Sequence, residues 1–296
     1  MNDVCRIGLG GQEAAITPVG AALCAYRVDG RDAVVPFEPG TVPPAFNGAV
    51  LAPWPNRLRD GAYEWDGVRQ QLPVTEPDRM TALHGLACWQ RWGVLSSDAS
   101  SVTLRLDLPA QPGWPHLLRL DACYSLSDAG LAVTVTAANL GTTSLPYGIG
   151  FHPWLSTGGA SLDACALQLD AATHVVADDR LLPRRAEPVA GAYDLRRPTS
   201  LAGLDLDDAW TDASTDASGR SWGRLARPDG SCVSVWMEVP LSCWQVCTGD
   251  HIDGFERAGV AVEPMTCLAD AFNTRERLVH LAPGACHSVC WGIGVE

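Results

Sequence analysis

Positive charge is scarce in this chain of 296 residues. Lysine and arginine together number 21 against 34 aspartates and glutamates, so the formal net charge is −13, and no basic run is longer than a pair. Proteins that bind nucleic acid or an anionic membrane surface neutralise phosphates with clustered basic side chains. The composition therefore excludes both as expected partners. Hydrophobic residues make up 47% of the chain, which excludes global disorder.

The sequence also lacks a long apolar run and a leader. No stretch approaches 18 consecutive apolar residues, so we expect no transmembrane helix. Residues 1–6 show no basic segment leading into an apolar one, so we expect no signal peptide. The eleven cysteines form no CxxC pair, and their odd number does not suit a disulfide framework. We therefore expect free thiols in a cytoplasmic protein.

Helical patterns are weak, whereas strand patterns are common. No long stripe of period 3.6 with a cap at each end occurs. Apolar side chains instead alternate with polar ones over residues 103–108, 118–126 and 131–137, and the turn 127–130 joins the last two segments. This pattern predicts an antiparallel hairpin with one buried face. Two more strands are predicted at 231–239 and 287–293.

Two Asp-Gly pairs predict further turns. Asp66-Gly67 stands directly between two β-prone runs, and both residue types tolerate the positive φ of a type I′ turn. Asp29-Gly30 predicts a hairpin with a loop longer than two residues, because the next β-prone run starts at Ala33. The polar stretch 212–219 reads as a surface loop. We expect an all-β fold, with residues 1–296 forming a single large antiparallel β-sandwich domain.

Two segments offer groups suited to binding a sugar. Trp54 offers a stacking face, while Asn56 and Arg57 offer hydrogen-bond donors. A surface turn with a salt-bridging arginine is the simpler alternative for these three. His84 precedes a glycine that permits close backbone approach, and a purely structural histidine is the alternative there.

Two further segments hold groups that can exchange protons near neutral pH. His152 follows Gly148-Ile149-Gly150 and Phe151, and it precedes a Pro-Trp pair. This frame can hold an imidazole beside open space, although a core histidine at a strand end is an equal alternative. Glu263 follows the apolar run 260–262, so we expect it at a strand end, where partial burial would raise its pKa. An ordinary surface glutamate is the alternative.

Taken in order, these segments resemble the aldose 1-epimerase (galactose mutarotase) family. The resemblance extends from Asn56 to Asn273, and six motifs in the family's order carry it. They are Asn56-Arg57 with Gly61 and Tyr63, Leu83-His84-Gly85, Gly150-Phe151-His152-Pro153-Trp154, Leu206-Asp207-Asp208-Ala209-Trp210, Gln245-Val246-Cys247-Thr248-Gly249, and Val262-Glu263-Pro264-Met265-Thr266.

The resemblance implies a fold and a set of site residues. It implies a large β-sandwich with an open cleft for a small-molecule sugar, and neither a metal nor an organic cofactor. It implies that His152 is the general acid and Glu263 the general base of the reaction. The residues that it implies for substrate binding are Asn56, Arg57, His84, Asp207 and Gln245. Asp205 and Asp208 stay as alternatives to Asp207, and Cys247 stands where an aromatic residue is common.

Such an enzyme would interconvert α and β anomers of a free aldose through the open-chain aldehyde. The chain has no HExxH, P-loop or GxGxxG motif that would point to another chemistry. Two rival functions stay open. One is a hexose-phosphate 1-epimerase, for which Arg59 and Arg79 are candidate phosphate ligands. The other is a sugar-binding module without turnover, which would not need a paired acid and base.

Overall fold

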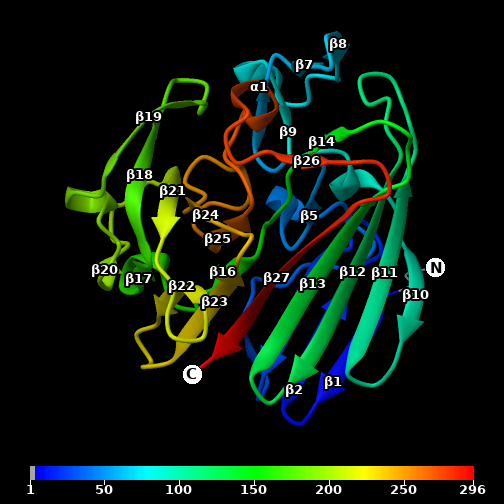
Figure 1. Ribbon diagram of the computed structural model, residues 1–296. Coiled ribbons are helices and arrows are strands. Elements are labelled where there is room, and N and C mark those ends of the chain that lie inside the picture. The colour runs from blue at the N-terminus through cyan, green and yellow to red at the C-terminus, as the bar shows by residue number, and fades with distance from the viewer. Residues whose placement is uncertain (1–3) are drawn as a thin grey trace.

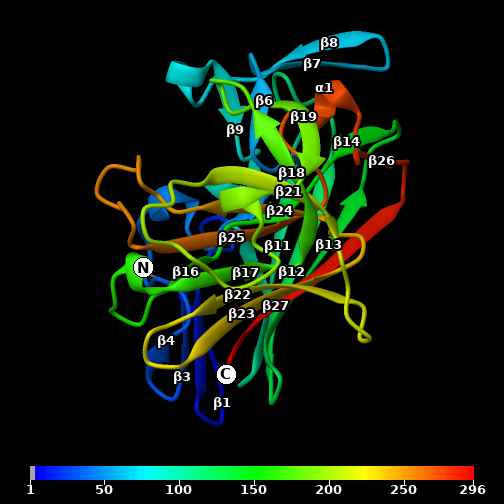
Figure 2. The same cartoon turned by 90° about the vertical axis from the view of Figure 1, so that its left-hand side faces the viewer.

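The computed structural model describes residues 4–296, and two large antiparallel sheets dominate it (Figures 1 and 2). The nine-stranded sheet has the order β10 (Gly93–Ser97), β11 (Ser101–Leu108), β12 (Leu118–Ser127), β13 (Gly130–Asn139), β27 (Cys286–Val295), β23 (Cys232–Glu238), β22 (Arg220–Ala226), β17 (Ala166–Leu169) and β20 (Thr199–Ser200). The eight-stranded sheet has the order β19 (Pro183–Pro188), β18 (Ala171–Ala177), β21 (Asp207–Ala213), β24 (Cys243–Cys247), β25 (Gly259–Met265), β15 (Gly150–Phe151) and β5 (Val50–Leu51), with β16 (Trp154–Ser156) also paired to β25.

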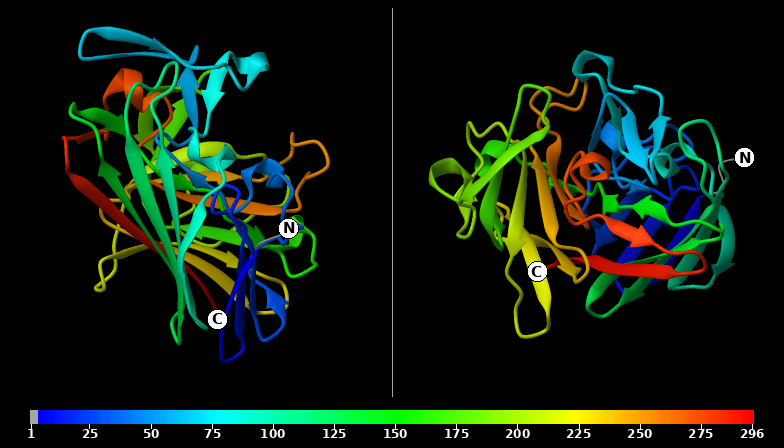
Figure 3. Two further views of the ribbon diagram at one scale, coloured as in Figure 1. Left: turned by 90° about the vertical axis from the view of Figure 1, so that its right-hand side faces the viewer. Right: turned by 45° about the horizontal axis from the view of Figure 1, so that its top comes forward.

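Smaller sheets and short helices complete the chain. The four-stranded sheet comprises β1 (Cys5–Leu9), β2 (Gln12–Ile16), β3 (Leu23–Val28) and β4 (Arg31–Asp32), and the strand pairs are β6 (Arg57–Arg59) with β9 (Thr81–Leu83), β7 (Ala62–Trp65) with β8 (Val68–Gln71), and β14 (Leu145–Tyr147) with β26 (Val279–Leu281). The β7–β8 hairpin projects from one end of the molecule (Figure 3). The helical pieces are η1 (Pro44–Phe46), η2 (Pro77–Arg79), η3 (Ala87–Trp89), η4 (Leu162–Ala164), η5 (Gly191–Tyr193) and α1 (Ala271–Thr274).

The predicted all-β class is confirmed, and so is the hairpin predicted from alternation. Strands β11, β12 and β13 pair in register, with Leu104 opposite Ala122 and Ala122 opposite Val135. Apolar side chains on one face of all three strands are buried, while the intervening polar residues are at least partly exposed. Within residues 4–296, no helix has the length and apolar character needed to cross a membrane.

Both Asp-Gly pairs form two-residue turns. Asp66 and Gly67 have φ of 50° and 77°, and they join β7 directly to β8. The longer loop expected at Asp29-Gly30 is wrong, because strand β4 resumes at once with Val28 opposite Arg31. The second strand was expected to begin at the β-prone run from Ala33. Strand β4 instead consists of the two polar residues Arg31 and Asp32. The loop expected over 212–219 is exposed, although β21 extends to Ala213.

The two large sheets pack face to face through β22 of one sheet and β24 and β25 of the other. The indole of Trp244 donates a 3.1 Å hydrogen bond across the interface to the hydroxyl of Ser221. The close packing requires a glycine at position 223 of β22, because a Cβ there would lie 2.6 Å from Val262 of β25. This packing buries one face of the eight-stranded sheet, and its other face is free to supply side chains to a cleft.

Candidate active site

One cavity of about 730 Å³ brings together most of the side chains predicted from the sequence. Its lining includes six of the seven predicted site residues, namely Asn56, Arg57, His84, His152, Asp207 and Glu263. The seventh, Gln245, lies beside them and donates a 2.7 Å hydrogen bond from its amide to Asp207. Strands β21, β24 and β25 supply three of these side chains, and the β6–β9 pair and its flanks supply three more.

The centre of the cleft is a buried contact between His152 and Glu263. His152 lies between the short strands β15 and β16, and only 6% of its surface is exposed. Glu263 is 1% exposed and pairs with Gln245 inside β25, so the expectation of a strand end or a surface position is wrong. The Nε2 atom of His152 lies 3.4 Å from Oε1 of Glu263. Two titratable side chains therefore face each other at the cleft floor.

Burial decides the protonation of this pair. It raises the pKa of the Glu263 carboxyl well above its ordinary value, and the negative charge of Asp207 adds to the rise while Arg57 opposes it. Burial also lowers the pKa of the His152 imidazole to about 3. Burial therefore favours the form of the pair with one proton on Glu263 and a neutral His152. Transfer of that proton across the contact gives a carboxylate and an imidazolium without changing the total charge.

His84 is held in one tautomer by the backbone. Its Nδ1 accepts a 3.1 Å hydrogen bond from the N–H of Asn56, so the ring proton lies on Nε2. Burial lowers the pKa of His84 well below its ordinary value, and the neighbouring His152 and Arg57 disfavour a charge on it further. The residue after it, Gly85, has φ of 75°, and a Cβ there would lie 2.3 Å from a backbone oxygen. His84 is thus a neutral, rigid hydrogen-bond donor.

Aromatic rings shield the two histidines from water. Phe46 lies 4.5 Å from the His84 ring and 6.2 Å from the His152 ring, measured between centroids. Trp154 lies 5.7 Å from His152 on a nearly parallel plane. Trp54, expected to offer a stacking face, does not line the cleft. It is 3% exposed and packs edge-on against Phe272, so its role is in the core.

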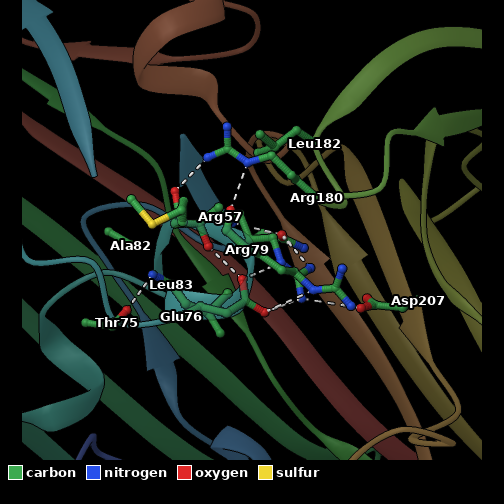
Figure 4. A network of polar contacts seen from close by, with 12 residues as sticks. Arg57, Thr75, Glu76, Arg79, Ala82, Leu83, Arg180, Leu182 and Asp207 are labelled. Atoms are coloured by element: carbon green, nitrogen blue, oxygen red, sulfur yellow. Dashed lines mark hydrogen bonds and ion pairs between the residues drawn. The ribbon is translucent and has the colours of Figure 1, made fainter. Parts of the chain in front are cut away.

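Arg57 is fixed by a carboxylate that the sequence did not reveal. Its Nε and one terminal nitrogen each donate a 2.9 Å hydrogen bond to Glu76, and the same terminal nitrogen lies 3.5 Å from Asp207 (Figure 4). The hydroxyl of Thr81 also donates to Glu76, at 2.6 Å. The surface turn considered for Arg57 is wrong, because the residue is 8% exposed. The other terminal nitrogen has one long contact, 3.5 Å to Asn56, and can bind a ligand.

The three neighbouring aspartates have different partners in the structure. Asp207 contacts Arg57 and Gln245 and lies close enough to Glu263 to influence its pKa. Asp208 bonds instead to His174, with 2.8 Å between Oδ1 and Nε2. Asp205 pairs with an exposed histidine, His251, at 2.7 Å. The geometry thus favours Asp207 over its two neighbours as the aspartate of the cleft floor.

The charges of the cleft are mostly negative. Its lining holds three arginines and eight carboxylates, and Glu76 or Glu187 pairs with each arginine. Of the two arginines considered for a phosphate, Arg59 bonds to Asp270 and does not line the cavity. Arg79 lines it but lies 3.5 Å from Glu76 and donates to a backbone oxygen. Residues 4–296 contain no group of three His, Cys, Asp or Glu side chains placed to hold a metal ion.

Comparisons with known proteins identify the family of this chain. Residues 4–289, nearly the whole chain, match the sequence profile described as Aldose 1-epimerase. The chain belongs to the aldose 1-epimerase family. It is 33% identical over 290 residues to the uncharacterized protein YihR of Escherichia coli K12, an alignment that covers 97% of this chain and 91% of YihR.

Solved structures of other proteins share the fold. A putative aldose 1-epimerase from E. coli K12 superposes with a TM-score of 0.84 at 21% identity, covering 99% of this chain and 98% of that one. A galactose 1-epimerase from Lactobacillus acidophilus NCFM gives a TM-score of 0.82 at 18% identity, covering 99% and 94%. The galactose mutarotase-like β-sandwich expected from the motifs is therefore confirmed as the fold.

The structure of this aldose 1-epimerase family member also reveals residues of the site that the motifs do not contain. Glu76 and Phe46 lie outside every motif, and only the folded chain brings them beside Arg57 and His152. A buried arginine needs a carboxylate partner, but no spacing in the sequence singles out Glu76 among the chain's 34 aspartates and glutamates. Cys247 lines the cleft in place of an aromatic wall, and burial raises its thiol pKa well above the ordinary value.

Proposed function

We propose that the protein is an aldose 1-epimerase that interconverts the α and β anomers of a free, uncharged aldose. The observation that carries the proposal is the buried contact between His152 and Glu263 at the floor of a cavity large enough for a sugar. Membership of the aldose 1-epimerase family supports the reaction class. A binding module would gain nothing from two titratable groups buried in contact, because burying them costs free energy.

The reaction needs one proton removed and one delivered. In ring opening, Glu263 as carboxylate takes the proton of the anomeric hydroxyl, and His152 as imidazolium protonates the ring oxygen. The C1–O5 bond breaks, O1 becomes the carbonyl oxygen, and the aldehyde rotates about the C1–C2 bond. Ring closure on the other face then returns both protons to their starting groups. Each partner typically contributes roughly 10²–10⁴ in rate.

The protonation that burial favours for this pair fits the cycle. After ring opening, Glu263 carries a proton and His152 is neutral, which is the form that burial favours. The form needed to open a ring differs from it by one proton transfer between atoms 3.4 Å apart. Both forms have the same net charge, so the pair can alternate between them without exchanging protons with solvent.

The remaining side chains orient the sugar. The Nε2–H of His84 is available as a donor because Nδ1 is occupied by the backbone of Asn56. Arg57 is locked by Glu76, so its free terminal nitrogen is held at one place in the cleft. Gln245 fixes Asp207, whose carboxylate can accept from sugar hydroxyls. Holding a reactant in a productive geometry is a large part of enzymatic rate enhancement.

The charge of the cleft favours an uncharged sugar over a sugar phosphate. A phosphate would face seven acidic side chains besides Glu263, and the three arginines that could receive it are already paired with Glu76 or Glu187. Binding it would require breaking one of these ion pairs.

Polarimetry of freshly dissolved pure anomers tests the proposal. The wild-type protein should speed the decay of optical rotation of α-D-galactose or α-D-glucose above the spontaneous rate, and it should act more weakly on the corresponding 6-phosphates. Preference for a 6-phosphate would support the hexose-phosphate alternative. Binding of a sugar without any acceleration, across the panel, would instead support a sugar-binding module.

A further inference from the structure

The two histidines of the cleft are held in place by different means. The Nδ1 atom of His84 accepts a hydrogen bond from the backbone of Asn56, and such a bond usually fixes the orientation of a functional histidine. The Nδ1 atom of His152 is buried and has no hydrogen bond to another residue within 4–296, and its own backbone cannot tie the ring to a neighbouring element. The contact of Nε2 with Glu263, at 3.4 Å, is longer than an ordinary hydrogen bond. The orientation of the His152 ring must therefore come largely from the groups packed around it.

Phe46 packs against both imidazoles, although it belongs to no motif. Its ring centroid lies 4.5 Å from that of His84 and 6.2 Å from that of His152, and its plane is inclined by only 24° to the His152 ring. Trp154 lies 5.7 Å from the same imidazole, with 23° between the planes. The χ2 torsion of a histidine has a broad energy profile, so neighbouring atoms decide its value in a packed interior. Two nearly parallel aromatic rings therefore limit how far the His152 ring can turn.

The backbone that carries Phe46 has a conformation that side chains disfavour. Ala45 and Phe46 have φ of 48° and 56°, and they are the only two consecutive residues other than glycine with positive φ within 4–296. The left-handed region costs free energy for such residues, and it persists only where the surrounding contacts maintain it. The fold therefore keeps the Phe46 ring in its place at a cost, which points to a role for that placement.

Hydrogen bonds tie this strained turn directly to the surroundings of the catalytic histidine. The indole of Trp154 donates a 3.1 Å hydrogen bond to the backbone oxygen of Ala45. The backbone N–H of Gly48 donates a 2.8 Å hydrogen bond to the backbone oxygen of His152. The turn, the Trp154 indole and the His152 backbone thus form one closed set of contacts, and the Phe46 ring is positioned by the same groups that flank the imidazole.

We propose that Phe46 is a positioning residue for the acid–base pair, which fixes the His152 ring by packing so that its Nε2 atom faces Glu263. A turned or displaced imidazole would carry Nε2 away from Glu263 and from the ring oxygen of the sugar, and proton transfer falls steeply with such misplacement. The expected effect on rate rests on the proposed epimerase function. The effect on the environment of His152 is independent of turnover, because the contacts lie within the protein.

Polarimetric kinetics of variants at two phenylalanines test this role. Phe46→Ala should lower kcat for mutarotation roughly 10- to 100-fold, while KM changes by less than about threefold. Phe46→Tyr, which keeps the ring, should retain kcat within about threefold of the wild type. Phe37→Ala is the matched control, because Phe37 is partly buried against the same small apolar cluster as Phe46 but does not line the cleft. It should leave kcat unchanged.

Nuclear magnetic resonance of the histidine rings gives a second readout that needs no turnover. The His152 signal is the one that disappears in His152→Asn, and its position is followed against pH. The titratable side chains that face this ring are Glu263 and His84, and both remain in Phe46→Ala. Burial lowers the pKa of His152 to about 3, so removal of a covering ring should raise the titration midpoint by roughly one pH unit or more. Phe37→Ala should not move it.

The outcomes separate this inference from the epimerase proposal. The positioning role requires both readouts to move in Phe46→Ala and neither to move in Phe37→Ala. A rise in KM with kcat unchanged, an unchanged midpoint, or equal effects in the two variants would overturn it while the epimerase stands. If Phe46→Ala does not fold by circular dichroism, Phe46→Leu, which keeps apolar bulk without a flat ring, is judged by the same criteria. If the wild type turns over no sugar, the epimerase proposal fails and the midpoint alone decides for or against the role of Phe46.

Discussion

The carboxylate of Glu76 is expected to matter for both stability and activity, although it belongs to no motif. It accepts two 2.9 Å hydrogen bonds from Arg57 and one 2.6 Å bond from Thr81. The Arg57 side chain is 10% exposed and that of Glu76 is 20% exposed. In Glu76→Ala, the buried guanidinium keeps only its two 3.5 Å contacts, to Asp207 and Asn56.

The size of the effect follows from this loss. Removing one partner of a fully buried ion pair typically costs about 3–5 kcal/mol, and partial exposure and the Asp207 contact reduce this to roughly 2–3 kcal/mol here. For a chain of this size each kcal/mol lowers the melting temperature by about 2–4 °C, so we expect a fall of about 4–12 °C. An Arg57 that is no longer fixed should also lower kcat/KM by roughly tenfold or more, mainly through KM.

The stabilising effect of Glu76 should depend on pH. Burial alone would raise the pKa of Glu76, but hydrogen bonds from Arg57 and Thr81 and the charge of Arg57 lower it below the ordinary value. Its stabilising effect is therefore complete above its unfolded pKa of about 4.5 and is lost as the pH falls through the folded pKa. The stability difference between wild type and Glu76→Ala should be largest near neutral pH and shrink below pH 4.

Thermal unfolding followed by circular dichroism, together with polarimetric kinetics, measures both effects. Glu64→Ala is the matched control, because Glu64 is exposed on the β7–β8 hairpin and should change neither quantity. An unchanged melting temperature and an unchanged KM in Glu76→Ala would refute the reasoning about Arg57.

Three further predictions concern the pair, a glycine and the thiols. Because burial lowers the pKa of His152 to about 3, kcat should show no acid limb near pH 6.5, and such a limb would contradict the buried pair. Gly85→Ala should destabilise the protein by about 2–4 kcal/mol, since its Cβ would clash with Ala52, and an unchanged melting temperature would contradict this. Thiol titration of denatured, non-reduced protein should find close to all eleven cysteines, with Cys286 reacting first in the native state, and mostly disulfide-bonded cysteines would contradict it.

The fold could be predicted from the sequence where local chemistry determines it. Alternation over β11, β12 and β13 predicted the buried face correctly, because a strand has a strict period of two. The Asp66-Gly67 turn was readable for the same reason, since few residue pairs tolerate its backbone angles. The short strand β4 was missed because Arg31 and Asp32 carry no strand signal of their own.

The candidate active site could be predicted from the sequence only in part. The family motifs contained both members of the acid–base pair, but the local sequence pattern placed Glu263 at a strand end and Trp54 where it could stack on a sugar. Contacts between distant segments decided these points: Glu263 lies in a strand paired on both sides, and Trp54 packs against Phe272. The partner of Arg57 and the contact of Phe46 with His152 likewise depend on tertiary packing, which has no local pattern.

The most direct test of the proposed mechanism is the mutarotation rate of two conservative variants. Glu263→Gln keeps the shape and hydrogen bonding of the carboxyl but cannot act as a base, and His152→Asn keeps a polar group that cannot transfer a proton near neutral pH. On the preferred sugar, each change should lower kcat by roughly 10²-fold or more while sugar affinity falls much less. The double variant should lose less than the product of the two single losses, because the pair acts as a unit. Near-wild-type rates in both single variants, after correction for spontaneous mutarotation, would contradict the account.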